Sequence, residues 1–192
     1  MFEPNPKARA DLKPGTLYAV VGENGWIYYG QIDPDKSVAF VRRRDRSVAE
    51  ASEILSSDLM SVVTVFYPSI GEALRSGAWE KIGRYPIGEK LGTRPRRVQW
   101  PVGTITVTVW DHRGTSFGTT VQDPEIQHLE VMSAWDASHH IKERLTADFG
   151  VEDPAWHVGG PVWRERKVKE EYARRFPEIS SHSLPADWVF TG

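Results

Sequence analysis

Apolar and polar positions alternate along three short runs near the N-terminus. The runs are Leu17–Val21, Trp26–Ile32 and Ser37–Arg42. They are rich in β-branched and aromatic residues, which favour strands. Asn24-Gly25 lies between the first two runs, and both central positions of a type I′ hairpin turn need positive φ. Asp33-Pro34-Asp35 is a second turn signal, so the pattern predicts a strongly bent antiparallel meander.

A near-continuous apolar run over residues 59–67 predicts a buried strand that ends at Pro68. Ser69 and Glu72 have the spacing of a capping box, which predicts a short helix over Ile70–Ser76 with Gly77 as its C-terminal stop. Trp79 follows that stop and precedes apolar Ile82, which predicts a core position for its ring.

The second half of the chain holds one clear strand pattern and two helix patterns. Residues 104–110 alternate with period two, and 115–121 are expected to pair back across a turn at Asp111. Ser133 and Asp136 form a second capping-box pattern, which predicts a helix over residues 134–149 that ends at Gly150. Pro161 is a good first helical residue and predicts a helix to Arg175.

These elements predict an α+β fold, in which a strongly bent antiparallel β-sheet, barrel-like or a sandwich, carries two or three peripheral helices. Residues 1–12 are polar with two prolines and are expected to form a loose N-terminal arm. Residues 13–150 are expected to form one β-rich domain that includes helix 134–149. Residues 151–192 are expected to be a helical C-terminal extension packed on that domain.

Composition removes several classes of function. The 192 residues include no cysteine, which excludes disulfides, thiolate metal sites and a cysteine nucleophile. The net charge of −2 argues against a dedicated DNA-binding protein, which is normally basic. Neither a signal-peptide pattern nor an apolar run long enough for a membrane span is visible, so we expect a cytoplasmic protein without a membrane partner.

Candidate catalytic residues have simpler structural interpretations. Asp136, His139, His140 and Glu143 fall within two turns of one predicted helix, and i,i+4 pairs share a face as helical metal ligands do. No further ligand is identifiable, so solvent-exposed helix residues are the favoured interpretation over a metal site. Asp111-His112 resembles half of an acid–base pair, yet aspartate is also common at the start of a type I turn. No nucleophile or phosphate-loop motif is present, and we expect no enzyme activity and no cofactor.

A basic stretch between residues 88 and 97 offers an alternative function. Its cations are Lys90, Arg94, Arg96 and Arg97. With Trp79 and Trp100 nearby, they suggest phosphate pairing and base stacking by a small-barrel nucleic-acid-binding protein. Acidic residues in the N-terminal half weaken the positive electrostatic potential of this stretch, so nucleic acid is the less favoured partner. The glycines and proline of the stretch also make it the best linker candidate.

The order of three segments resembles the Imm26 family of bacterial immunity proteins, partners of polymorphic toxins. The segments are Gly15–Val21 with Trp26–Ile32, Gly77–Gly83 with Pro86-Ile87, and Leu129–Trp135 with Ile141–Leu145. The resemblance spans about residues 15–150. It implies a cytoplasmic protein that binds and neutralises one cognate toxin domain stoichiometrically, with no catalytic residues. It does not identify the toxin, and the basic stretch differs from the carboxylate-rich surface expected of a nuclease inhibitor.

If the protein is such an inhibitor, its second strand suggests where the toxin binds. Trp26 and Tyr28 share one face of that strand, and Ile27 on the other face is the natural core residue. We therefore expect Trp26 and Tyr28 to point outward, with the charge run Arg42–Arg46 beside them for charge steering. Arg42, Arg43 and Arg44 of this run are the expected binding residues. The alternatives are that the 161–176 helix or the Trp188 segment covers this face, and that the arginines are merely a solvated strand end.

Overall fold

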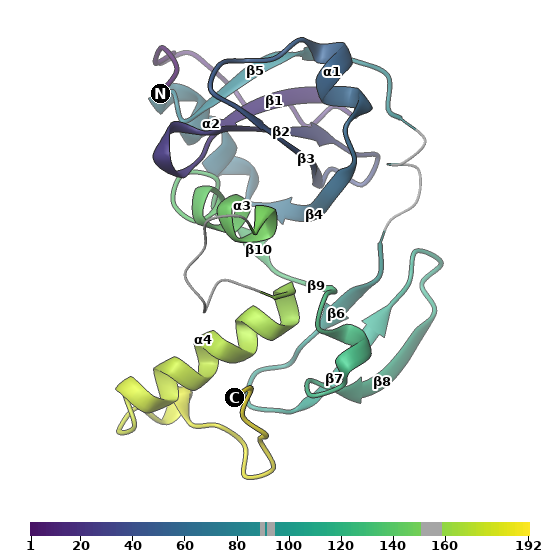
Figure 1. The fold of residues 1–192 in the computed structure, drawn as a ribbon, viewed down its shortest axis with the longest axis vertical. Helices are drawn as coiled ribbons and strands as arrows, with labels where there is room; N and C mark the ends of the chain where they lie inside the picture. Colours follow the sequence, from purple (N-terminus) through teal and green to yellow (C-terminus); the bar gives the residue numbers. More distant parts are fainter. Residues whose placement is uncertain (89–90, 92–94, 151–158) are drawn as a thin grey trace. The chain divides into compact units, whose positions relative to one another are not determined.

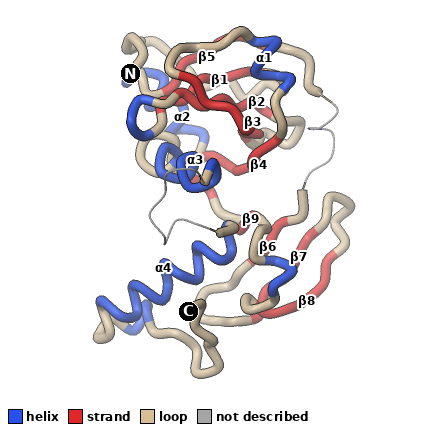
Figure 2. Tube along the Cα trace, viewed as in Figure 1, coloured by secondary structure: helices blue, strands red, loops and turns tan. Residues whose placement is uncertain are grey.

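The computed structural model describes residues 1–88, 91, 95–150 and 159–192. The chain is an α+β protein that divides into two compact units (Figures 1 and 2). Unit 1 comprises Met1–Thr93 and Ser133–Glu152, and unit 2 comprises Arg94–Met132 and Asp153–Gly192. The predicted single domain over residues 13–150 is therefore wrong, because residues 95–132 build a sheet and a core of their own.

A curled six-stranded sheet forms the centre of unit 1, in the order β10-β4-β3-β2-β1-β5. Its strands are β1 (Thr16–Val21), β2 (Ile27–Ile32), β3 (Val38–Asp45), β4 (Leu59–Val65), β5 (Trp79–Arg84) and β10 (Ala134–Trp135). All neighbours are antiparallel except β10 and β4. The register shifts within the β1–β5, β2–β3 and β3–β4 pairs, and such irregularities bend a sheet, which accounts for its strong curvature.

The predicted N-terminal hairpin is present, with Val21 opposite Ile27 and β3 added beside β2. Its loop is longer than the two-residue turn that was expected. Residues 22–26 form it, including a 3-10 turn over Glu23–Gly25 (η1), and the Gly22 amide donates to the Trp26 carbonyl. Asn24 and Gly25 do have positive φ, at 54° and 72°, as the sequence predicted.

Both faces of this sheet are packed. Helices α2 (Tyr67–Ser76) and α3 (Ile141–Phe149) supply Ile70 and Leu145 to a core on one face. Helix α1 (Ala51–Ser56) supplies Ile54 to a second core on the other face. Trp79 is 2% exposed and belongs to the first core, which confirms its predicted position.

Both predicted capping boxes are wrong, although both predicted glycine stops are confirmed. Helix α2 begins at Tyr67, and the Ser69 hydroxyl donates to the Phe66 carbonyl while accepting from the Ala137 amide. The predicted helix 134–149 begins only at Ile141, because Ala134–Trp135 pairs with β4. Gly77 and Gly150 end the helices in the left-handed region, at φ 78° and 74°.

The expected loose arm over residues 1–12 is docked onto unit 1. The Phe2 amide donates to the Gly77 carbonyl at 2.8 Å. The Asp11 amide donates to the Tyr18 hydroxyl, which in turn donates to the Asp11 carbonyl. Ala8, Ala10 and Leu12 pack against the first core, so apolar contacts hold an arm that composition alone suggested was free.

Unit 2 is built on a four-stranded sheet in the order β8-β7-β6-β9. Its strands are β6 (Arg97–Gln99), β7 (Thr106–Trp110), β8 (Ser116–Thr120) and β9 (Glu130–Val131). The predicted hairpin of β7 and β8 is confirmed, as is helix α4 (Pro161–Arg175). Val162 of α4 joins a core with Val98, Val107 and Leu129. Two 3-10 turns, η3 (Pro124–Ile126) and η5 (Ser180–His182), complete the unit.

In the described part of the chain, no helix combines the length and apolar character that crossing a membrane requires.

Candidate functional site

Of the two aromatic residues predicted to point outward, Trp26 is partly exposed and Tyr28 is not. Tyr28 is fully buried, and its ring lies edge-on to Phe149, with centroids 6.0 Å apart. The prediction for Tyr28 is wrong because helix α3 covers this face of the sheet. Trp26 is half-buried at the start of β2, where the packing is less complete.

Two arginines of β3, the arginine that follows this strand, and two aromatic rings form an arginine–aromatic stack. Its members are Trp26, Arg42, Arg44, Arg46 and Phe149. The Arg46 guanidinium lies 3.6 Å from the centroid of the Trp26 ring, and the Arg44 guanidinium lies 4.2 Å from the same centroid. Arg44 is also 4.4 Å from the Phe149 centroid, so it sits between two rings. The Arg42 guanidinium is 5.8 Å from Phe149. All four distances are within the range of cation–π attraction.

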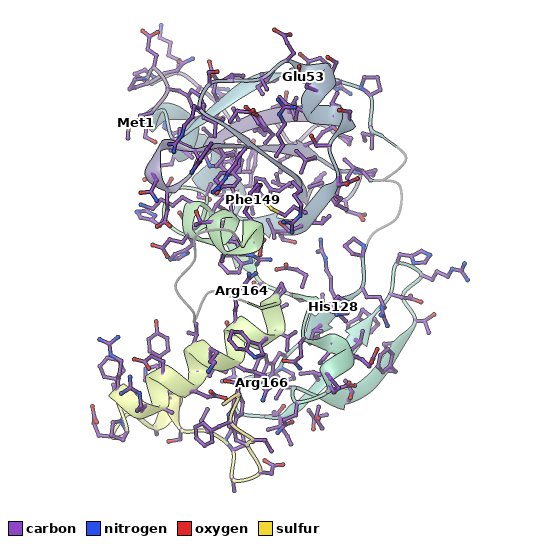
Figure 3. All side chains as sticks on the ribbon, in the orientation of Figure 1. Met1, Glu53, His128, Phe149, Arg164 and Arg166 are labelled. Atoms are coloured by element: carbon purple, nitrogen blue, oxygen red, sulfur yellow. The ribbon has the colours of Figure 1, made fainter. Side chains whose placement is uncertain are left out.

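Backbone acceptors fix the two outer arginines of the stack. Arg42 donates to the carbonyls of Asp148 and Phe149 at 3.3 and 3.2 Å, at the C-terminal end of α3, where a helix dipole favours a cation. Figure 3 shows Phe149 at this end of α3. Arg46 donates to the Asn24 carbonyl in the β1–β2 loop. The stack is thus arranged before any partner binds.

Arg43 does not join the stack. Successive strand residues point to opposite faces, and Arg43 instead pairs with Asp45 at 2.8 Å and with Glu53 of α1 at 2.8 Å. Its hydrogen bond with Asp45 holds the pKa of Arg43 above its usual value. The stack therefore includes Trp26, Arg42 and Arg44 of the predicted binding residues, and excludes Tyr28 and Arg43.

One member of the stack, Phe149, was missed by the sequence interpretation. Arg46 belonged to the predicted charge run, and Arg42, Arg44 and Arg46 alternate along the chain and so share a face. Phe149 had no sequence signal, because it is brought to the arginines only by the tertiary packing of α3.

The basic stretch proposed for nucleic acid is not assembled as expected. Lys90 and Arg94 lie outside the described residues. Arg96 is exposed, but Arg97 is 6% exposed within β6. The prediction that Arg97 contacts a phosphate is wrong, because its side chain is buried and not offered to a nucleic-acid backbone.

The candidate acid–base and metal residues have local structural roles. Asp136 accepts from the amides of Ser138 and His139 and from the His139 ring nitrogen, which organises the turn before α3. Asp111 accepts from the amides of Arg113 and Thr115, both at 2.8 Å, in the β7–β8 turn. Within residues 1–88, 91, 95–150 and 159–192, no three His, Asp or Glu side chains are grouped to hold a metal ion.

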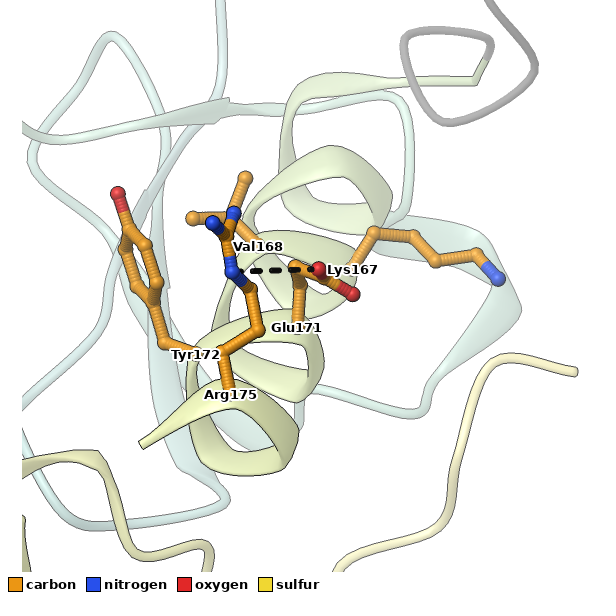
Figure 4. Close-up of a pocket in the computed structure, with 5 residues that line it drawn as sticks. All are labelled: Lys167, Val168, Glu171, Tyr172 and Arg175. Carbon is orange, nitrogen blue, oxygen red and sulfur yellow. Dashed lines mark ion pairs between the residues drawn. The ribbon is translucent and has the colours of Figure 1, made fainter. Parts of the chain in front are cut away.

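Helix α4 borders a cavity of about 500 Å³, lined by Lys167, Val168, Glu171, Tyr172 and Arg175 (Figure 4). Its charged groups pair with close neighbours. The Glu171 carboxylate lies 2.6 Å from Arg174 and 3.9 Å from Arg175, and hydrogen bonding to Arg174 lowers the pKa of Glu171. Lys167 donates to the Gly192 carbonyl. This arrangement stabilises the helix surface.

No family model, curated protein or solved structure matches the chain in the three comparisons made. The interpretation of the stack therefore depends on its own geometry.

Proposed function

We propose that this protein is a stoichiometric, non-catalytic inhibitor of a cognate protein toxin, as the resemblance to Imm26 immunity proteins implies, and that it binds an acidic surface of that toxin. The observation that supports the proposal is the arginine–aromatic stack. It gathers three cations and two rings on one side of the unit 1 sheet.

The composition of the stack suits a protein interface. Arginine and tryptophan are enriched among the residues that dominate binding energy, because each buries a large area and adds directional contacts. The Arg44 guanidinium is held between Trp26 and Phe149, so little side-chain entropy remains to be lost on binding.

The charge of the stack indicates the chemistry of its partner. Arg42 and Arg44 lie on one side of β3 and Arg46 follows the strand directly, and all three attract carboxylates during the diffusional encounter. Planar guanidinium groups bind carboxylates with two parallel hydrogen bonds, which adds orientation to the attraction. A toxin domain with clustered Asp and Glu side chains is the expected partner.

The test is calorimetric titration of the full chain with the toxin domain encoded beside its gene. Wild type should form a one-to-one complex. Arg44→Ala should weaken binding by about thirtyfold or more, the loss typical of a hot-spot residue. Arg43→Ala is the matched control, because Arg43 is the adjacent arginine of the same strand but pairs with Asp45 and Glu53. It should change the affinity less than about threefold.

Three results would contradict the proposal. Absence of a complex with the wild-type protein would rule out the proposed inhibitor function. Equal losses of affinity in Arg43→Ala and Arg44→Ala would show that the stack is not the binding interface. Salt-sensitive binding of single-stranded DNA by wild type, abolished by Arg44→Ala, would favour the nucleic-acid alternative.

A further inference from the structure

Strand β8 forms one edge of the four-stranded sheet of unit 2 (Figure 1). It pairs with β7, and among the described residues it has no second neighbouring strand. Four of its five residues are exposed, and Phe117 keeps 49% of its surface open to solvent. The outer side of β8 is therefore accessible to another molecule.

The backbone groups of β8 point alternately toward β7 and away from it. On either side of the strand pair, the Asp111 amide donates to the Thr115 carbonyl and the Val121 amide donates to the Ile105 carbonyl. Hydrogen-bonded pairs alternate with non-hydrogen-bonded pairs in an antiparallel ladder. The register of the two strands then assigns the odd-numbered residues of β8 to the bonds with β7.

The even-numbered residues of β8, which are Ser116, Gly118 and Thr120, direct their amides and carbonyls away from the sheet. The Thr120 carbonyl accepts from the Asp123 amide in the turn that follows. Within the described residues, the Ser116 carbonyl, both groups of Gly118 and the Thr120 amide remain available to an added strand. Ser116 and Thr120 are symmetric about Gly118, as antiparallel pairing with an identical strand requires.

The edge strand β5 of unit 1 has protection that β8 lacks. It carries exposed Glu80, Lys81 and Arg84, and its register with β1 shifts. Charges and irregularities of this kind keep edge strands from pairing with other molecules. Between Thr115 and Gln122 the sequence has no charged residue, and β8 pairs with β7 without a shift. The outer side of β8 is thus a regular, uncharged edge.

Opposite charges stand at the two ends of this uncharged segment. Arg113 precedes it and Asp123 follows it, each equally far along the chain from Gly118. Antiparallel pairing of two copies would bring the Arg113 end of one strand beside the Asp123 end of the other. Complementary charges of this kind favour the register centred on Gly118 over shifted registers.

From this arrangement we infer that β8 pairs antiparallel with β8 of a second copy of the chain, about a two-fold axis at Gly118. The two Gly118 residues exchange both of their backbone hydrogen bonds, and each Thr120 amide donates to the Ser116 carbonyl of the other copy. Phe117 of each copy lies opposite Thr119 of the other, so its exposed ring is partly removed from water.

The dimer joins two unit 2 sheets and does not use the arginine–aromatic stack of unit 1, so it is independent of the proposed toxin binding. A contact between two short strands is small for a protein interface. We therefore expect monomer and dimer to exchange at protein concentrations of about 10–1000 µM.

Paired charges at Ser116 and Thr120 test this register, because the two residues face each other across the proposed dimer. One variant combines Ser116→Lys with Thr120→Lys and places like charges opposite each other. Its matched control combines Ser116→Lys with Thr120→Glu and places opposite charges there. In sedimentation equilibrium of the full chain, the first variant should dimerise at least about tenfold more weakly than the second.

A second pair of variants tests the backbone bonds at the two-fold axis. Gly118→Pro removes the outward amide, and proline is tolerated on an edge strand where its nitrogen faces solvent. It should be monomeric, whereas Gly118→Ala keeps the amide and should still dimerise. In wild type, hydrogen exchange at the Gly118 and Thr120 amides should slow as the protein concentration rises.

Several results would overturn the inference. A wild type that stays monomeric up to about 1 mM would do so. So would equal dimerisation of the two paired-charge variants, or a dimer in which the Gly118 and Thr120 amides exchange as fast as in the monomer. Slower exchange of these amides only when the toxin domain is added would assign the edge to the toxin, and would also overturn the inference.

Discussion

The carboxylate of Glu170, on helix α4, accepts a hydrogen bond from the indole nitrogen of Trp188 at 3.0 Å. The same carboxylate accepts from the amide and the hydroxyl of Thr191, at 2.9 and 2.7 Å. The Trp188 ring also stacks on Trp100 of unit 2, with centroids 6.0 Å apart and planes inclined by 17°. One side chain of α4 thus anchors the last residues of the chain within unit 2.

Replacing this carboxylate should release the C-terminal segment. Glu170→Ala leaves the Trp188 and Thr191 donors without their acceptor, so we expect unit 2 to lose about 1–3 kcal/mol of stability. Hydrogen exchange at the Thr191 amide and the Trp188 indole should accelerate. Glu165→Ala is the control, since Glu165 makes only a partly exposed pair with Lys169 at 3.1 Å. Unchanged exchange at Thr191 in Glu170→Ala would show that other contacts hold the segment.

Trp79 should be a major contributor to the stability of unit 1. Its ring lies 5.6 Å from that of Tyr18 and 6.3 Å from that of Phe40, within a core it helps to fill. Trp79→Ala removes these contacts and leaves a cavity, which should cost about 3–5 kcal/mol in urea denaturation. A Trp79→Ala variant with wild-type stability would contradict this prediction and would mean that neighbouring side chains repack to fill the cavity.

Local patterns predicted the elements whose determinants lie close together in the sequence. The Asn24-Gly25 signal placed the β1–β2 hairpin, because positive φ at consecutive residues is a local requirement. Helix α4 begins at Pro161 as predicted, since proline fits the first turn and the chain around it has helical spacing. Gly77 and Gly150 were predicted as stops for the same kind of reason.

The features that sequence reasoning missed depend on distant partners. The Ala134–Trp135 segment has a plausible helical cap, but pairing with β4 across about seventy residues overrides it. Tyr28 is buried because α3 packs over it. No sequence pattern close to Tyr28 predicts that this helix covers it. Phe149 is likewise far in sequence from the arginines, so no local pattern predicts that it joins the arginine–aromatic stack.

Gly160 should be sensitive to the smallest substitution. A Cβ at this position would lie 2.2 Å from the Gln127 carbonyl oxygen and 2.3 Å from the His128 Cα, both backbone atoms that cannot turn aside. We expect Gly160→Ala to destabilise unit 2 by about 1–3 kcal/mol or more, the usual cost of overpacking.

Gly118 in strand β8 is the matched control for Gly160. Its nearest neighbour to an added Cβ is the Val107 carbonyl oxygen at 4.0 Å. Gly118→Ala should therefore be neutral or stabilising by about 0.5 kcal/mol, because alanine loses less backbone entropy on folding. Equal destabilisation of the two variants in thermal unfolding would contradict the close approach at Gly160.

Two buried tyrosines should make unit 1 sensitive to alkaline pH. Burial raises the pKa of Tyr18 to about 12 and that of Tyr29 to about 12, from an ordinary value of 10.0. The folded state therefore holds these protons more tightly than the unfolded state does. Their contribution to stability is complete below pH 10 and is lost as the pH rises toward 12.

The free energy of unfolding, measured in urea at a series of pH values, should therefore fall over this window. Tyr18→Phe should be less stable than wild type at neutral pH by about 1 kcal/mol, because the phenol bonds to both the amide and the carbonyl of Asp11. The same variant should lose less stability between about pH 10 and 12, since phenylalanine cannot ionise. Tyr67→Phe is the control, because Tyr67 is 50% exposed, and it should retain the wild-type decline. If Tyr18→Phe declines as steeply as wild type, other groups cause the alkaline unfolding.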